Sequence, residues 1–293
     1  MHKRKKIAII GGDARYLRLI HSLQRINWLD VVLVGFDQVE QSYTGVKQSS
    51  LEELLPEELD AIVLPITGIH DNGKVETVFS NKEWEITEDW FKRLPDHCVI
   101  FTGITSKTLD RWVEKYKYTL EELMERDDIA IYNSIPTAEG AIMLAIQHTD
   151  ITIHQANIFI YGFGRVGQTT ANKFAGLGAK ITIISRSEVE LSRAFEQGYR
   201  GILLKDSQKY IDQCEILVNT IPSLVITKTV LNNMESNKLI IDLASKPGGV
   251  DFDFAKERGI QTIHALGLPG LVAPKTAGEI LANIIVNRLQ EEN

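Results

Sequence analysis

Three glycines with the spacing of a phosphate-binding turn lie near the middle of the chain. Gly162, Gly164 and Gly167 form the pattern G-x-G-x-x-G within IFIYGFGRVGQTTANKFAGLG. In a dinucleotide site the first glycine makes a tight turn, the second lets the pyrophosphate approach the backbone, and the third lets the helix pack on the strand. The pattern alone is a weak signal. Here it follows an apolar strand and opens a helix, and it therefore predicts a dinucleotide site at the helix N-terminus.

The next apolar strand ends with residues that bear on the choice between NAD and NADP. An NAD site usually has an acidic side chain at this strand end, which bonds the ribose 2′-hydroxyl. The chain has Ser185, Arg186 and Ser187 there, and an arginine flanked by hydroxyls suits a 2′-phosphate. We therefore expect NADP (NADPH when reduced) as the cofactor. The alternative is that Arg186 points to solvent and that Glu188 bonds the ribose, which would favour NAD.

Later turns at strand ends are expected to complete this site. They are NTIPS at 219–223, DLASKPGG at 242–249 and ALGLPG at 265–270, and ordinary turn chemistry explains any one of them equally well. All of them fall where open α/β sheets bind ligands. The predicted cofactor-binding residues are Gly162, Phe163, Gly164, Arg165, Val166, Gly167, Ser185, Arg186, Ser187, Thr220, Ile221, Pro222, Leu243, Ala244, Ser245, Gly267 and Pro269.

The elements that position these residues are apolar runs of strand length, separated by segments of helical period. In the second half the runs begin at 157, 180, 201, 216, 239 and 261 and predict a doubly wound parallel sheet, the Rossmann architecture. In the first half they begin at 7, 31, 61 and 98, with AIYN at 130 as a fifth candidate. We expect an α/β fold with an N-terminal flavodoxin-like domain and a C-terminal-half Rossmann domain.

Two apolar helical segments are expected to join these domains. One opens at Asn133, with Ser134 as a candidate cap and Pro136 near its first turn. The other begins after Ala273 and is expected to return to the first domain, so that the two helices form a hinge beside a cleft. The expected division is a substrate and catalytic domain over 1–132, a linking helix over 133–150, a Rossmann NADP-binding domain over 151–273, and a closing helix over 274–293.

Composition excludes several classes of protein. The chain has 293 residues, 44% of them hydrophobic, and a formal net charge of −7, which argues against a nucleic-acid partner. No apolar stretch approaches the ~20 residues that a membrane span needs. No signal peptide is expected, because no apolar segment of suitable length follows the basic residues 2–6. Cys98 and Cys214 lie in or beside apolar runs, which predicts buried thiols and a cytoplasmic location.

Longer stretches carry a more specific resemblance. They are IGGDAR, VGFDQ, VFSN, HCVIFTGI, ERDDIAIYNSIPTAEGAIMLAIQHTD, DLASKPGGVDF and GLPGLVAPKTAGEILAN. Over nearly its whole length the chain resembles the family of dipicolinate synthase A subunits from spore-forming bacteria. DLASKPGG is also similar to the alanine dehydrogenase and transhydrogenase group, and the two-lobed layout resembles D-2-hydroxyacid dehydrogenases. The arginine–glycine and histidine–proline signatures of the latter catalytic set are not evident.

The resemblance implies a reaction and a partner. A cyclic precursor from lysine biosynthesis, 4-hydroxy-tetrahydrodipicolinate or dihydrodipicolinate, would be oxidised to pyridine-2,6-dicarboxylate during sporulation, with loss of water and with NADP accepting hydride. It also implies the cytoplasm of the mother cell and a flavoprotein-like B subunit of dipicolinate synthase, and leaves a homo-oligomer open. One alternative is another NADP-dependent oxidoreductase of a 2-hydroxy or 2-amino acid. The second is a nucleotide-binding protein that is active only with the B subunit.

A dicarboxylate substrate needs cationic or N–H partners, and its oxidation needs a general acid or base. The expected substrate-binding residues are Gly11, Gly12, Arg15, Thr105, Ser106, Lys246, Lys275 and Thr276. The candidates for the acid or base are Asp13, His70 and His264, although a lone histidine is often structural. Asp127 and Asp128 suit a turn and a cap better than a catalytic pair. No histidine or cysteine spacing indicates a metal site.

The opening stretch IAIIGGDARYLRLI, residues 7–20, resembles a second nucleotide turn. It lacks the third glycine, and Asp13 would put a negative charge where a pyrophosphate sits. We interpret it as the same helix-terminus device used for a smaller anion, with Gly11, Gly12 and Arg15 facing a substrate carboxylate. The alternative is that Arg15 is a solvated residue on the first helix.

Overall fold

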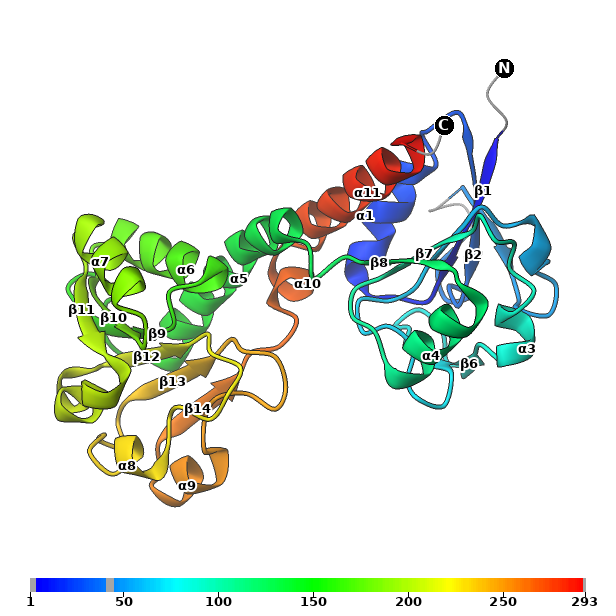
Figure 1. Ribbon diagram of the computed structural model, residues 1–293. Coiled ribbons are helices and arrows are strands. Elements are labelled where there is room, and N and C mark those ends of the chain that lie inside the picture. Colours follow the sequence, from blue (N-terminus) through cyan, green and yellow to red (C-terminus); the bar gives the residue numbers. More distant parts are fainter. Residues whose placement is uncertain (1–3, 41–44, 292–293) are drawn as a thin grey trace. The chain divides into compact units, whose positions relative to one another are not determined.

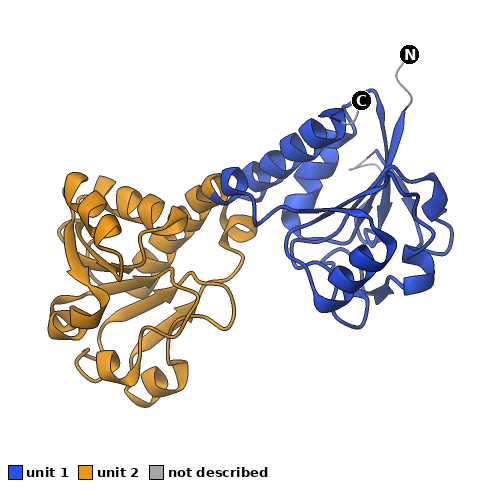
Figure 2. Ribbon diagram, in the orientation of Figure 1, with its two compact units in different colours: residues 1–130, 273–293 blue, residues 131–272 orange. Residues whose placement is uncertain are grey.

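A computed structural model describes residues 4–40 and 45–291 of the chain. The chain divides into two compact units, which are coloured separately in Figure 2. Unit 1 comprises residues 1–130 and 273–293, and unit 2 comprises residues 131–272. Each unit is built around its own sheet (Figure 1).

The sheet of unit 1 has six strands in the order β3-β2-β1-β4-β7-β8, and neighbouring strands run parallel. Without the short edge strand β3, the remaining five follow the order 2-1-3-4-5 of flavodoxin-like sheets, as expected. The strands are β1 (Lys5–Ile10), β2 (Leu29–Val34), β3 (Lys47–Ser49), β4 (Ala61–Val63), β7 (Val99–Thr102) and β8 (Thr119–Glu122).

Both faces of this sheet are covered, which explains its nearly continuous apolar strands. In β1 the side chains of Ile7 and Ile9 join one buried cluster, and those of Ala8 and Ile10 join the other. A small hairpin, β5 (Lys74–Val75) with β6 (Trp84–Glu85), is inserted between β4 and β7. The described residues of unit 1 include the α-helices α1 (Ala14–Leu23), α3 (Glu88–Phe91), α4 (Lys107–Tyr116) and α11 (Pro274–Glu291).

The closing helix α11 packs against α1, although the two are far apart in sequence (Figure 1). Leu281 and Ile285 of α11 are buried in the same cluster as Ile20 of α1. A Cβ atom at Gly278 would lie 2.2 Å from the carbonyl oxygen of Arg15, so the two backbones meet at this glycine. The last turns of the chain therefore complete the core of unit 1.

Unit 2 has the strand order β11-β10-β9-β12-β13-β14, which is the order 3-2-1-4-5-6 of a Rossmann fold. All six predicted strands are present, so the predicted architecture of this half is confirmed. They are β9 (Asn157–Tyr161), β10 (Lys180–Ser185), β11 (Arg200–Leu203), β12 (Ile216–Asn219), β13 (Leu239–Asp242) and β14 (Gln261–His264). The α-helices of unit 2 that follow β9 are α6 (Arg165–Gly176), α7 (Glu188–Glu196), α8 (Lys228–Leu231), α9 (Phe252–Glu257) and α10 (Leu268–Val272).

Helix α5 (Asp127–His148) begins earlier than the sequence pattern predicts. The run AIYN at 130 is helical, so its interpretation as a strand was wrong, because a four-residue apolar run does not separate the two structures. Asp127 and Asp128 lie in the first turn, where carboxylates are favourable. Ser134 is therefore not the cap. Its hydroxyl donates to the carbonyl of Ile131 at 2.6 Å, and Pro136 lies inside the helix.

Helix α5 is long and apolar enough to cross a membrane. The sequence pattern did not predict such a helix. Its most apolar window has a mean hydropathy of 1.3, and 44% of that window is buried. Core helices of soluble proteins meet the same criteria, and Ala138, Ala141 and Ala145 of α5 are fully buried. This helix is therefore weak evidence for a membrane span.

Candidate functional site

A cavity of about 520 Å³ lies in unit 2 at the carboxyl ends of β9, β10 and β12. This is the edge of a doubly wound sheet at which ligands bind. Most of the predicted residues of the glycine turn and of the next strand end line it. The lining residues are Gly162, Phe163, Gly164, Arg165, Val166, Ser185, Arg186, Glu190, Leu204, Thr220, Ile221, Pro222, Ser223 and Val225.

The three glycines of the turn have the geometry that a dinucleotide needs. Gly162 has φ +91°, which favours glycine, and a Cβ atom at Gly167 would lie 2.2 Å from the carbonyl oxygen of Gly162. At Gly164, by contrast, no atom lies within 4 Å of an added Cβ, so the backbone is open to a ligand. Gly164 also caps α6 without a side chain, which leaves this helix end open to phosphate. The site therefore fits a pyrophosphate.

The end of β10 contains a hydrogen-bonded group of three side chains. The Ser185 hydroxyl donates to Glu190 Oε2 at 2.5 Å and accepts the Ser187 N–H at 3.0 Å. Ser187 caps α7 by accepting the Glu190 N–H at 3.3 Å. Arg186 is exposed at the cavity wall. The acidic residue that reaches this strand end is thus Glu190, which the sequence pattern did not single out, and not Glu188.

The loop after β13 is held by a buried carboxylate. Asp242, which is fully buried, accepts hydrogen bonds from Asn219 Nδ2 at 2.8 Å, from the Ala244 N–H at 3.0 Å and from the Gly249 N–H at 2.7 Å. Because three donors satisfy it, this carboxylate fixes the loop that contains Leu243, Ala244 and Ser245. These predicted cofactor residues lie next to that network, and Gly267 and Pro269 lie at the start of α10.

His264 makes two contacts within unit 2. Its Nε2–H donates to the carbonyl of Ala244 at 2.9 Å, and its ring stacks on Phe252 with the centroids 5.2 Å apart. The first contact joins β14 to the Asp242 loop, and the second joins it to α9. The hydrogen bond uses Nε2 and leaves Nδ1 as the ring nitrogen that could act as an acid or base, so the catalytic role of His264 stays a prediction.

A second cavity, of about 430 Å³, lies in unit 1 between the first helix turn and the β5–β6 hairpin. Its walls carry two close side-chain pairs: His70 Nε2 lies 3.0 Å from Glu76 Oε1, and Lys74 Nζ lies 2.8 Å from Glu83 Oε2. The lining residues are Gly12, Asp13, Pro65, Ile66, Thr67, His70, Lys74, Val75, Glu76, Thr77, Val78, Lys82, Glu83 and Trp84. The structure thus brings two catalytic candidates, Asp13 and His70, to one cavity.

The opening turn does not have the arrangement that the sequence predicted. The Gly11 N–H donates to the carbonyl of Val34 at 2.9 Å, and the Gly12 N–H donates to that of Glu76 at 3.0 Å. Both backbone donors are therefore used inside the protein, and the prediction that they bind a substrate carboxylate was wrong. The physical reason is β2 for Gly11, since Val34 ends that strand, and the hairpin segment for Gly12, which forms an isolated parallel bridge with Thr77.

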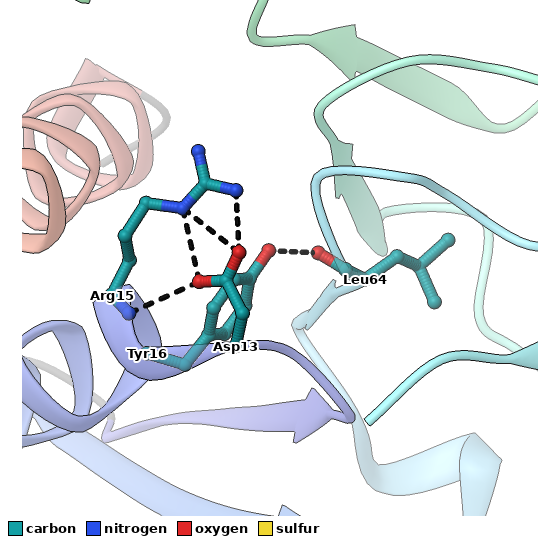
Figure 3. A network of polar contacts seen from close by, with 4 residues as sticks. All are labelled: Asp13, Arg15, Tyr16 and Leu64. Atoms are coloured by element: carbon teal, nitrogen blue, oxygen red, sulfur yellow. Dashed lines mark hydrogen bonds and ion pairs between the residues drawn. The ribbon is translucent and has the colours of Figure 1, made fainter. Parts of the chain in front are cut away.

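Arg15 is also engaged, as Figure 3 shows. Its guanidinium bonds both oxygens of Asp13, with distances of 2.5 to 3.1 Å, and its side chain is 8% exposed. Asp13 in turn caps α1 by accepting the Arg15 N–H at 3.0 Å. The neighbouring Tyr16 hydroxyl donates to the carbonyl of Leu64 at 2.6 Å. Arg15 therefore orients Asp13 at the cavity, and it is neither a ready carboxylate clamp nor a solvated residue.

Among the other predicted substrate residues, those of unit 1 do not line this cavity, and Lys246 belongs to unit 2. Ser106 caps α4 by accepting the Leu109 N–H, and Thr105 donates to Asp110 at 2.5 Å, so both stabilise the start of α4. Lys246 is exposed in the loop after β13. Lys275 and Thr276 are exposed in the first turn of α11, and a role for these three in substrate binding stays a prediction.

The hairpin residues Lys74, Lys82 and Trp84 line this cavity, although the sequence pattern did not indicate them. The resemblance to the dipicolinate synthase family could have indicated them, because VFSN at 78–81, one of the stretches that carry it, lies in this hairpin. Within residues 4–40 and 45–291, no group of three or more histidine, cysteine, aspartate or glutamate side chains could hold a metal ion.

The fold and the glycine cradle define the class of protein: a dehydrogenase with a nicotinamide-cofactor domain. Residues 133–292 match the family model of the alanine dehydrogenase/PNT C-terminal domain. The transhydrogenase of Sinorhizobium meliloti shares this fold, with a TM-score of 0.66 and 14% identity over 98% of this chain and 94% of that chain.

The chain belongs to the family of dipicolinate synthase A subunits. Residues 6–124 match the family model of the N-terminal domain of the dipicolinate synthase A subunit. The chain is 47% identical to the A subunit of dipicolinate synthase from Bacillus subtilis (strain 168) over 98% of this chain and 96% of the relative. The crystal structure of the A subunit of dipicolinate synthase from Bacillus halodurans has a TM-score of 0.94, 48% identity, and 99% coverage of both chains.

Proposed function

We propose that this chain oxidises a cyclic dihydrodipicolinate-type substrate to pyridine-2,6-dicarboxylate, with NADP as hydride acceptor. The 47% identity to the dipicolinate synthase A subunit over 98% of the chain carries the proposal. The substrate that enters is 4-hydroxy-tetrahydrodipicolinate or its dehydrated form.

The proposed reaction balances in two steps. Loss of the hydroxyl group and a ring proton as water converts 4-hydroxy-tetrahydrodipicolinate into dihydrodipicolinate. Removal of one hydride and one proton then gives the aromatic pyridine ring, and the bound nicotinamide supplies the hydride acceptor. Because aromatisation makes this oxidation favourable, the protein's task is mainly to orient the ring and to accept the proton.

The cavity of unit 2 is the proposed cofactor site. Gly162, Gly164 and the N-terminus of α6 would bind the pyrophosphate, since this turn leaves an open backbone cradle. Arg186 and Ser187 would bind the 2′-phosphate of NADP by charge-assisted hydrogen bonds. Thr220, Ile221 and Pro222 line the same cavity from the end of β12.

The charged cavity of unit 1 is the proposed site of substrate recognition. Lys82 supplies a cation that can pair with a carboxylate of the substrate, whereas Lys74 is already paired with Glu83. Asp13 is held by Arg15 and, with His70, supplies an acid or base at the same cavity. His264 belongs to unit 2 and stays a catalytic candidate through Nδ1, because its Nε2–H is bonded to Ala244.

We also propose that the chain's partner is a flavoprotein-like B subunit of dipicolinate synthase, and that its location is the cytoplasm of the mother cell in sporulation. The relatives are named as A subunits, which supports a partner. The purified chain should be assayed with and without the relatives' B subunit. Turnover by the chain alone contradicts the alternative that it is active only in the complex.

The remaining alternative, oxidation of a 2-hydroxy or 2-amino acid, has its own test. Pyruvate or glyoxylate, with ammonia as needed, would consume NADPH if that alternative were correct. We expect no consumption with these acids, and we expect NADPH to form from NADP when the product of dihydrodipicolinate synthase is supplied.

A further inference from the structure

The cofactor cavity contains a carboxylate at the place where the 2′-phosphate of NADP is expected. Glu190 is the third residue of α7, and its side chain reaches back to the end of β10, where Oε2 accepts the Ser185 hydroxyl at 2.5 Å. Glu190, Ser185 and Arg186 all line the cavity. The strand end thus has an acidic group although the sequence places none directly after the strand.

Glu190 uses one of the hydrogen-bond donors at this strand end. A serine hydroxyl has one proton, and that of Ser185 is used for Glu190. Ser185 is 2% exposed, so the protein interior holds this arrangement in place. Ser187 keeps its own hydroxyl proton, because it only accepts from the Glu190 N–H. Of the three side chains expected to bind a phosphate, Arg186 and Ser187 therefore still have protons to donate.

The Glu190 carboxylate has opposite effects on the binding of NADP and NAD at this strand end. A 2′-phosphate beside Glu190 would meet a like charge, which weakens binding. The 2′-hydroxyl of NAD can instead donate a hydrogen bond to the same carboxylate, as it does to the acidic residue of ordinary NAD sites. Arg186 and the N-terminus of α7 favour the phosphate.

We infer that Glu190 is a specificity-determining residue for the nucleotide: its carboxylate accepts a hydrogen bond from the ribose 2′-hydroxyl of NAD and opposes the 2′-phosphate of NADP. This inference rests on the proposed function, in which the cavity of unit 2 holds the nicotinamide cofactor. The chain then binds both nucleotides, and the preference for NADP that Arg186 and Ser187 provide is reduced by Glu190.

The test compares two variants that remove the same charge from the same helix turn. Glu190→Gln keeps the size of the side chain and an acceptor for Ser185, so the fold at the strand end is retained. Glu188→Gln is the matched control, because Glu188 is exposed in the first turn of α7 and lies outside the cavity lining. The dissociation constants of NAD and NADP are measured for the wild type and both variants by fluorescence titration.

We expect Glu190→Gln to shift the ratio of the two dissociation constants toward NADP by about tenfold, and Glu188→Gln by less than about threefold. A shift for Glu190→Gln that is not at least about threefold larger than that of the control overturns the inference. If the wild type binds neither nucleotide, the proposed function fails and the inference with it. Nucleotide binding with an unchanged ratio overturns the inference alone.

Discussion

At the scale of single residues, Arg15 neutralises the negative charge of Asp13 in the opening turn. The Arg15 side chain is 8% exposed, while its partner Asp13 is 36% exposed at the wall of the unit 1 cavity. A guanidinium that is planar and bonds both carboxylate oxygens orients that carboxylate more firmly than a point charge. Arg15 is therefore a positioning residue for Asp13.

Arg15→Ala should lower the free energy of unfolding by about 1–3 kcal/mol, because it leaves the Asp13 carboxylate without its charged partner. Arg15→Lys should recover part of this loss, since an ammonium cannot bond both oxygens with the same geometry. Urea denaturation measures both effects. Equal stability of Arg15→Ala and the wild type would show that the ion pair contributes nothing.

Lys82→Gln should raise the KM for the dicarboxylate substrate by about tenfold, because it removes a cation from the proposed substrate cavity. The affinity for NADP should not change, since the cofactor cavity belongs to unit 2. Lys92→Gln is the control, because it makes the same charge change elsewhere in unit 1, at an exposed side chain that pairs with the exposed Asp89. A KM that is the same in both variants would remove Lys82 from the substrate site.

At the scale of elements, the turn between β9 and α6 depends on the close approach of its own backbone. The position of Gly167 leaves no room for a side chain, because an added Cβ would lie 2.2 Å from the carbonyl oxygen of Gly162. Gly176, at the other end of the same helix, has no atom within 4 Å of an added Cβ. Substitutions at these two positions therefore distinguish the steric need for a glycine in the turn from the low helix propensity of glycine.

Gly167→Ala should abolish or strongly weaken binding of NADP, because the helix must move away from the turn that holds the pyrophosphate. Gly176→Ala should leave binding unchanged and raise the stability by up to about 1 kcal/mol, as alanine favours a helix. Isothermal titration with NADP checks both variants. Wild-type affinity in Gly167→Ala would show that this turn does not hold the nucleotide.

Periodicity predicted the apolar elements, and it failed where an element is polar or short. The six strands of unit 2 were predicted because each is an apolar run. The edge strands β3 (KQS) and β8 (TLEE) are polar, so no apolar run marks them. The β5–β6 hairpin strands have two residues each, and the hairpin's pairing with Gly12 is a long-range contact that local sequence does not show. The glycine cradle could thus be predicted, while the use of Gly11, Gly12 and Arg15 could not.

At the scale of the whole molecule, each unit contains a buried side chain whose pKa is raised. Burial raises the pKa of Tyr16 in unit 1 and that of Tyr161 in unit 2 well above their usual range. Burial also raises the pKa of the Cys214 thiol to about 12. Both cysteines are buried, as the sequence predicts.

Stability should therefore fall at alkaline pH. Each of these groups has a higher pKa in the folded chain, so the folded chain binds more protons than the unfolded chain once the pH passes the unfolded values of about 8.5–10. The stability they contribute is fully present below those values and is lost as the pH rises above them. Urea denaturation at a series of pH values measures this decline, and constant stability up to about pH 11 would contradict it.

Thiol reactivity gives an independent check on the same burial. At about pH 8, a thiol reagent should modify neither Cys98 nor Cys214 in the folded protein and both after unfolding in urea, because both side chains are buried. The raised pKa of Cys214 further lowers its thiolate fraction. Rapid modification of Cys214 without denaturant would contradict its burial.

The stoichiometry of the reaction without oxygen tests the central claim most directly. The chain, with the relatives' B subunit present in a parallel sample, is supplied anaerobically with NADP and the product of dihydrodipicolinate synthase. NADPH and pyridine-2,6-dicarboxylate are then quantified together. The proposed function predicts one NADPH for each pyridine dicarboxylate formed. Pyridine dicarboxylate without NADPH, or neither product in both samples, would contradict it.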